Sequence, residues 1–172
     1  MTDGGQPTVA NVLRIADLAK GAANSLLDRF GLSLEQVEQH SAIPASFWGD
    51  EEAGVRGLEV YVRADTPVHS LLHEMCHVIC MDRERRGELD RDAGGNDLEE
   101  SAVCYLQIIL ADYLPGVGRE RLMADMDTWG YSFRLGKTKD WFVSDAEDAR
   151  LWLLRHELIN EACEPRWCLR ID

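Results

Sequence analysis

The sequence predicts a single α+β domain in which a small antiparallel sheet edge lies against a long helix. The chain has 172 residues, the length of one domain. Residues 58–64 alternate apolar and polar side chains with the period of a strand, whereas several longer segments place apolar residues at helical spacing. We therefore treat residues 1–172 as one domain, with an N-terminal helical part (1–50), a central part (57–114) and a helical and aromatic C-terminal part (115–172).

The N-terminal part is expected to be helical. Residues 9–30 carry an apolar stripe at helical spacing, which ends at Gly31. Residues 33–36 have the pattern of a capping box, serine followed three positions later by glutamine. We therefore predict a short second helix that ends before Pro44. The strand at 58–64 follows after a turn-rich stretch.

Two strong helices are predicted in the central part. Residues 65–67, Asp-Thr-Pro, supply an N-cap and a proline for the first helical position, and this helix should run to about Arg85. The second helix is predicted from Asp97 to Leu114, where a proline and a glycine follow. The connector between them, residues 82–100, is dense in charge. It is expected to be a solvated loop or, alternatively, a mobile lid.

The C-terminal part shows weaker patterns. Residues 119–127 predict a short helix, and residues 129–142, which are aromatic and interrupted by glycine, fit either a strand or a loop. A capping box at residues 144–147 predicts a final helix that extends to about residue 162.

Charge and composition exclude some classes of partner. The formal net charge is −13 and the isoelectric point is about 4.7, which argues against nucleic acid or an anionic membrane as the main partner. No apolar run approaches the length of a membrane span, and residues 1–7 lack the features of a signal peptide. The five cysteines are an odd number, and a reducing compartment would keep them as thiols. We therefore expect a cytoplasmic protein.

The stretch His73-Glu74-Met75-Cys76-His77 carries the strongest chemical signal. Two histidines four residues apart on a helix project to the same side, so that both imidazoles can bind one metal ion. Glu74 follows the first histidine and stands beside that metal, where it can accept a proton from water. The pattern predicts hydrolysis assisted by Zn²⁺.

A helical wheel separates residues 68–84 into two faces. The apolar face consists of Val68, Leu71, Leu72, Met75, Val78 and Ile79, and the polar face of His69, His73, His77, Cys80 and Glu84. His69, His73 and His77 cannot all bind one ion, because eight residues of helix rise about 12 Å. Glu74 favours the His73/His77 pair, which leaves His69 as a neighbour of the site or a packed histidine.

A catalytic zinc needs a third protein ligand, and no histidine follows at the required spacing. Glu99 and Glu100 open the next strong helix. Glu99 stands in line with the apolar face that should pack on the motif helix, where a buried carboxylate is costly unless it is paired or bound to a metal. Glu100 instead aligns with Cys104 and Gln107. We therefore predict Glu99 as the third ligand and keep Glu100 as the alternative.

With these residues the chain resembles the gluzincin branch of the zincin metallopeptidases. The resemblance rests on the motif at residues 73–77 together with Glu99-Glu100-Ser101-Ala102, which matches the family's glutamate at the start of an ExxA segment on a following helix. It implies that both motif histidines and Glu99 bind zinc. It also implies that Glu74 acts first as general base and then as general acid on a peptide or protein substrate.

The resemblance implies a zincin-like fold for roughly residues 57–114. The strand at 58–64 would be the edge strand above the cleft, along which an extended peptide could pair. Val103 stands where many relatives carry an aspartate that orients a ligand histidine, which leaves this supporting role unassigned. His156, Tyr131 and Tyr113 are candidate donors to the oxyanion that forms during hydrolysis.

Other interpretations use different residues. Cys76 and Cys80 are also four residues apart and could hold a structural metal, although buried free thiols are the commoner state. Cys163 and Cys168 could form a disulfide or remain thiols. A non-catalytic, zinc-binding regulatory or interaction protein of zincin-like fold is the alternative to a peptidase. In that case the aromatic stretch 129–142 would be a partner surface or part of the core.

Overall fold

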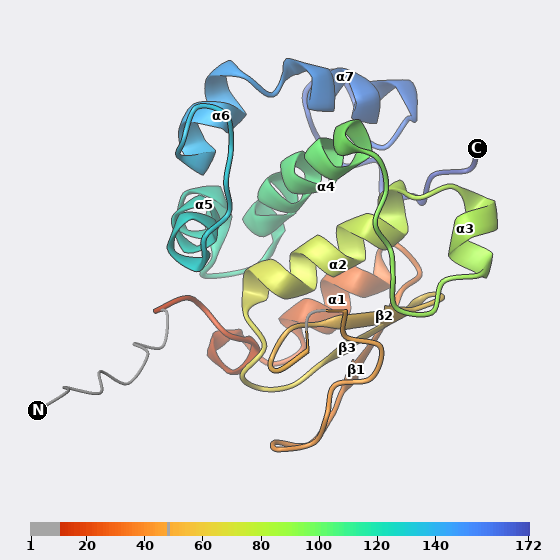
Figure 1. The fold of residues 1–172 in the computed structure, drawn as a ribbon, viewed down its shortest axis with the longest axis vertical. Coiled ribbons are helices and arrows are strands. Elements are labelled where there is room, and N and C mark those ends of the chain that lie inside the picture. The colour runs from red at the N-terminus through yellow and green to blue at the C-terminus, as the bar shows by residue number, and fades with distance from the viewer. Residues whose placement is uncertain (1–10, 48) are drawn as a thin grey trace, which may run out of the picture.

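The structure, a computed structural model, describes residues 11–47 and 49–172. Over these residues the chain is helix-rich and has a small sheet, which confirms the α+β class (Figure 1). The elements are η1 (Ile15–Asp17), α1 (Ala22–Asp28), β1 (Ser33–Gln36), β2 (Gly54–Arg56), β3 (Glu59–Val62), α2 (Val68–Cys80), α3 (Arg83–Gly87), α4 (Asp97–Leu110), η2 (Ala111–Tyr113), α5 (Gly118–Trp129), α6 (Thr138–Ser144) and α7 (Glu147–Arg155).

The strand predicted at residues 58–64 is confirmed as β3, but its place in the sheet differs from the prediction. The strand order is β1-β3-β2, with β1 parallel and β2 antiparallel to β3, so the sheet is mixed and β3 is central. Peptide addition along β3 is therefore excluded, because both of its edges are already paired. The outer side of β2 carries isolated bridges to Ser46 and Asp90.

Residues 33–36 form strand β1, so the capping-box prediction of a helix was wrong. The backbone N–H of Ser33 donates to the carbonyl of Leu58, and that of Val37 donates to Val62. These long-range bonds use the backbone groups that a helix would need. Pairing with β3 thus overrides a local signal that is weak by itself.

The predicted helix over residues 9–30 is also wrong as one continuous element. Residues 9 and 10 lie outside the described part of the chain. The N–H groups of Ile15 and Ala16 donate to the carbonyls of Thr66 and Ala64, which draws this segment alongside the approach to α2. Gly21 then adopts a left-handed conformation with φ of 78°, and α1 begins after it.

Helix α2, which carries the histidine motif, lies in the middle of the molecule. It packs against β2 and β3 on one side and against α4 on another, and α4 in turn contacts α5 and α7 (Figure 1). All of its residues except His73 are buried. Of the predicted polar face, His69, His77 and Cys80 are therefore buried, His73 is partly buried, and Glu84 lies outside this helix and is exposed.

The boundaries of the motif helix differ from the prediction. The helix begins at Val68, and Asp65 pairs with Arg63 instead of capping it. It ends at Cys80 rather than Arg85, because Met81 is extended. The Asp82 side chain then accepts a hydrogen bond from the N–H of Arg85 and starts the separate helix α3.

The remaining helices agree more closely with the sequence. Asn96 caps α4 through the N–H of Glu99, and residues 111–113 continue the predicted helix as η2. The predicted helix at 119–127 is confirmed as the longer α5. The ambiguous residues 129–142 contain the end of α5, a turn and most of α6. The final helix ends at Arg155 instead of residue 162.

The aromatic residues of the C-terminal part pack mainly inside the fold. Phe133 stacks on Trp141 with ring centroids 4.5 Å apart, and Tyr105 stacks on Phe142 at 4.6 Å. This set therefore joins α4 to α6.

Within the described residues, no helix is both long and apolar enough to cross a membrane.

Candidate metal centre

The two motif histidines meet a glutamate from α4. Because His73 and His77 lie one helical turn apart, their Nε2 atoms approach to 3.1 Å. One carboxylate oxygen of Glu100 lies 3.0 Å from Nε2 of His73, and the other lies 3.2 Å from Nε2 of His77. Among the described residues, these three form the only group of histidine, cysteine and acidic side chains arranged to hold a metal ion.

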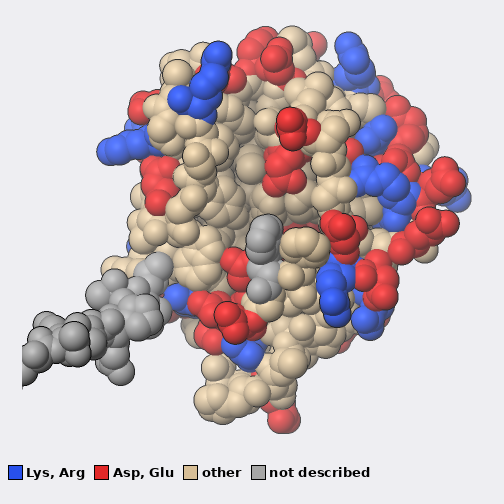
Figure 2. All heavy atoms as spheres, in the orientation of Figure 1, with Lys and Arg blue, Asp and Glu red and all other residues tan. Residues whose placement is uncertain are grey.

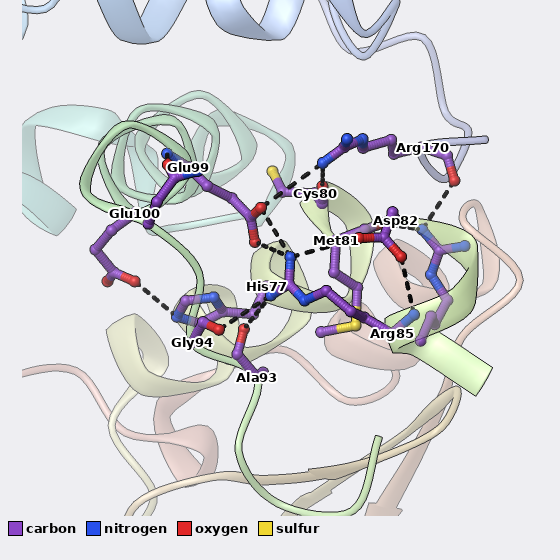
Figure 3. Close-up of polar contacts among 12 residues, drawn as sticks. His77, Cys80, Met81, Asp82, Arg85, Ala93, Gly94, Glu99, Glu100 and Arg170 are labelled. Atoms are coloured by element: carbon purple, nitrogen blue, oxygen red, sulfur yellow. Dashed lines mark hydrogen bonds and ion pairs between the residues drawn. The ribbon is translucent and has the colours of Figure 1, made fainter. Parts of the chain in front are cut away.

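Glu99, the predicted third ligand, does not join this group, and Glu100 takes its place. Figure 3 shows the two neighbouring glutamates pointing in different directions. Both carboxylate oxygens of Glu99 accept hydrogen bonds from Arg85 Nη1, at 3.0 and 2.9 Å, and Arg170 lies 3.7 Å away. The sequence argument that a buried carboxylate needs a partner holds for Glu99, which is 3% exposed, but the partners are arginines.

The separations between the ligand atoms are compatible with one bound metal ion. Zinc bonds of about 2.0–2.1 Å place tetrahedral ligand atoms about 3.3 Å apart. The two Nε2 atoms are 3.1 Å apart, and each lies 3.0 or 3.2 Å from a different oxygen of Glu100. Two imidazole nitrogens and one carboxylate therefore offer three ligands to a single metal ion.

The three members of the group differ in the direction of their pKa shifts. Burial lowers the pKa of His77 to about 4, and the neighbouring charge of His73 adds to this effect. Burial also opposes charge on His73, but its contacts with Tyr131, Cys104 and Glu100 raise its pKa well above the usual value. Burial opposes charge on Glu100 as well, yet the hydrogen bond to His73 and the charges of both histidines lower its pKa. A protonated His73, a neutral His77 and an ionised Glu100 thus carry no net charge together, and a metal ion could take the place of the proton on His73.

Gln107 of α4 orients the first histidine. Its side-chain N–H donates to the carbonyl of His69 at 3.2 Å, so its Oε1 faces His73 Nδ1 at 2.8 Å. Nδ1 of His73 must then carry the proton and donate it, which leaves Nε2 free to bind a metal. Sequence reasoning left this supporting role unassigned. The only signal was that Gln107 aligns with Glu100 on the helical wheel of α4.

We expect Gln107→Leu to weaken zinc binding by about 10-fold to 100-fold, because Nδ1 of His73 would lose the acceptor that fixes its tautomer. Competition with a fluorescent chelator measures this affinity. Circular dichroism checks that the fold is retained, since Gln107 is fully buried. An unchanged zinc affinity in a folded variant would show that Gln107 does not support the ligand.

Glu74 lies beside the group without being part of it. Its side chain is 7% exposed and makes no hydrogen bond or ion pair with any described residue. Burial raises its pKa to about 7, which suits a group that must both accept and release a proton. Glu74 therefore lies beside the candidate ligands, and its role as the base stays a prediction.

Two cavities meet at Glu74, His73 and Glu100. The larger, of about 510 Å³, extends toward Trp129, Tyr131 and Phe133, and the smaller, of about 180 Å³, extends toward residues 91–94. Figure 2 shows that this face of the molecule is hollowed near its middle, with acidic groups beside the hollow. The candidate metal centre is thus accessible to a ligand of moderate size.

His69 lies one helical turn before His73 on α2, beside the candidate metal centre. Its Nδ1 is 3.2 Å from the hydroxyl of Tyr131, and its ring packs on Trp129 with centroids 4.9 Å apart. Burial lowers its pKa to about 3, so the ring is neutral. His69 therefore contacts Tyr131 and Trp129 rather than joining the ligand group, as expected from the rise of about 12 Å over eight residues of helix.

Only Tyr131 among the three candidate oxyanion donors lies at the cavity. His156 packs on Trp152 at 4.2 Å and pairs with Asp172, and Tyr113 packs on Trp167. The structure therefore brings neither His156 nor Tyr113 to the ligand group.

The cysteines do not form a second metal centre in the described part of the chain. All five are free, and Cys76, Cys80 and Cys104 are buried. Burial raises the pKa of the Cys76 thiol well above its usual value. Cys163 and Cys168 are also free rather than joined in a disulfide.

The charged connector between α2 and α4 contains α3 and then approaches the site. Arg85 holds it by donating to the carbonyls of Ala93 and Gly94 in addition to Glu99. A side chain at Gly95 would meet the Glu99 carboxylate, since a Cβ there would lie 2.4 Å from Oε1. The connector is therefore held in place by Arg85, and its residues 91–94 line the smaller cavity. Its role as a lid stays a hypothesis.

Comparison with protein-family models, curated proteins and solved structures finds no match to this chain. The chemistry of the candidate metal centre must therefore be argued from its own residues.

Proposed function

We propose that this protein is a zinc-dependent hydrolase, and more specifically a metallopeptidase. His73, His77 and Glu100 would bind the metal, and Glu74 would act as the general base. The observation that carries the proposal is the convergence of two imidazole nitrogens and one carboxylate beside a buried glutamate, Glu74, which has no hydrogen-bond or ion-pair partner among the described residues.

A zinc ion in this position would lower the pKa of a water molecule toward about 7 and polarise a scissile carbonyl. Glu74, which lines the same cavity as His73 and Glu100, would accept the proton of that water, and its raised pKa would let it pass the proton on to the leaving amine. Gln107 holds His73 in the tautomer that binds metal. The Tyr131 hydroxyl, at the larger cavity, is the candidate donor to the developing oxyanion.

The residue types of the three candidate ligands support the resemblance to gluzincins. The glutamate, however, is one residue later in the sequence than the motif match predicts. In that family a glutamate on a following helix completes the HExxH histidines, and here Glu100 has this geometry. The motif match pointed to Glu99, one residue earlier. The two positions differ by about 100° around α4, so only one of them can face the histidines.

Metal analysis together with a cleavage assay tests the proposal. We expect about one zinc per wild-type chain and loss of zinc in His77→Ala, because two ligands hold the metal poorly. His40→Asn changes an exposed histidine away from the group and should keep the metal. Wild-type protein should cleave a mixed pool of unstructured peptides. Bound zinc without any cleavage would favour the non-catalytic alternative, and zinc retained by His77→Ala would contradict the ligand assignment.

A further inference from the structure

The carboxylate of Glu52 lines the larger cavity. The proposed reaction does not use this carboxylate. Glu52 is partly buried, and its Oε1 accepts a hydrogen bond from the indole N–H of Trp129 at 2.9 Å. Among the described residues it has no ion-pair partner, whereas its neighbour Glu51 pairs with Arg14. The indole thus fixes the direction of the Glu52 carboxylate without neutralising it.

The charges around the larger cavity leave Glu52 uncompensated. Within the part of the chain that the structure describes, three carboxylates line the cavity, those of Glu52, Glu74 and Glu100, and no lysine or arginine does. A divalent zinc ion would offset the charges of Glu74 and Glu100. One negative charge then remains, and burying it is unfavourable unless a cation pairs with it. In keeping with this, burial raises the pKa of Glu52.

The walls of the cavity fit a side chain with an apolar stem and a charged end. Trp129, Tyr131 and Phe133 come from the end of α5 and the turn after it, and all three line the cavity. Aromatic faces pack well on methylene chains and attract cationic groups. The volume of about 510 Å³ lies in the range of pockets that hold small ligands.

We propose that the larger cavity is a specificity pocket for a lysine or arginine side chain of the substrate, with Glu52 as the residue that recognises its charge. This proposal rests on the proposed peptidase function. It places the scissile bond near a basic residue, because Glu52 lines the same cavity as His73 and Glu100.

Cleavage selectivity tests the pocket. N-acetylated peptide pools would carry lysine, arginine, norleucine or glutamate at one fixed position, so that no free N-terminus supplies the positive charge. We expect wild-type protein to prefer lysine or arginine to norleucine by about 10-fold to 100-fold, the range of a charge-assisted contact. The preference should vanish in Glu52→Gln and persist in Glu51→Gln. An equal rate for lysine and norleucine in wild type, or an unchanged ratio in Glu52→Gln, would overturn the proposal.

A binding measurement separates this proposal from the hydrolase itself. N-acetyl-lysine amide should shift the indole N–H resonance of Trp129, assigned with Trp129→Phe, and N-acetyl-norleucine amide should not. A shift of the Trp129 resonance without any hydrolysis would support the pocket and contradict the peptidase function. Hydrolysis with no shift from lysine, and with no lysine preference, would reject the pocket and leave the peptidase.

Discussion

Glu74→Gln should reduce peptide cleavage by about 100-fold to 10,000-fold while leaving the zinc content unchanged. The amide matches the carboxylate in shape, so packing around this buried side chain is kept. It cannot accept the proton that the reaction requires. Initial rates on the peptide pool and zinc content from the same preparation measure the two effects. Full activity in the variant would exclude Glu74 as the base, and loss of zinc would indicate a ligand instead.

The pH dependence of the free energy of unfolding provides an independent check on Glu74→Gln. The folded-state pKa of Glu74 is raised from 4.5 to about 7, so between these values the folded chain binds more protons than the unfolded chain. The free energy of unfolding of chelator-treated wild-type protein should therefore fall as pH rises through this window. Glu74→Gln should lack this component. Matching pH profiles for the two proteins would show that Glu74 is not held in a desolvated site.

Glu100→Gln and Glu99→Gln should have opposite effects. Glu100→Gln removes a direct ligand and should lower zinc affinity by more than about 100-fold, the upper range for supporting residues. Its effect on folding should be small, because Glu100 is only partly buried. Glu99→Gln should keep zinc and cost about 1–3 kcal/mol of stability, because the buried ion pair with Arg85 is broken while Arg85 stays partly exposed.

Zinc titration and chemical denaturation of both variants measure these effects. Each variant serves as the matched control of the other, since the two residues are adjacent and the substitution is identical. Loss of zinc in Glu99→Gln with retention in Glu100→Gln would restore Glu99 as the third ligand.

Several features could be predicted because they depend on local geometry. The pairing of His73 with His77 and the position of Glu74 follow from the pitch of one helix. The strand at 58–64 follows from a period of two within seven residues. In each case the interacting residues are close in sequence, so the pattern contains the necessary information.

Other features were missed because distant segments decide them. Residues 33–36 have a helical capping pattern, yet β3 takes their backbone hydrogen bonds. The strand β3 is central instead of being an edge strand, since β1 and β2 pair with its two sides. Such pairings join segments far apart in the chain, and local propensity cannot rank them.

By itself, the sequence determined a helix with His73 and His77 on one face and a glutamate beside them. Only the tertiary structure decided that Glu100 rather than Glu99 lies against the two histidines, that Gln107 contacts His73, and that Glu52 lines the same cavity. The physical reason is the rotation of α4 about its axis as it packs on α2. Adjacent residues point about 100° apart, so this packing alone places one glutamate on the histidines and the other on Arg85.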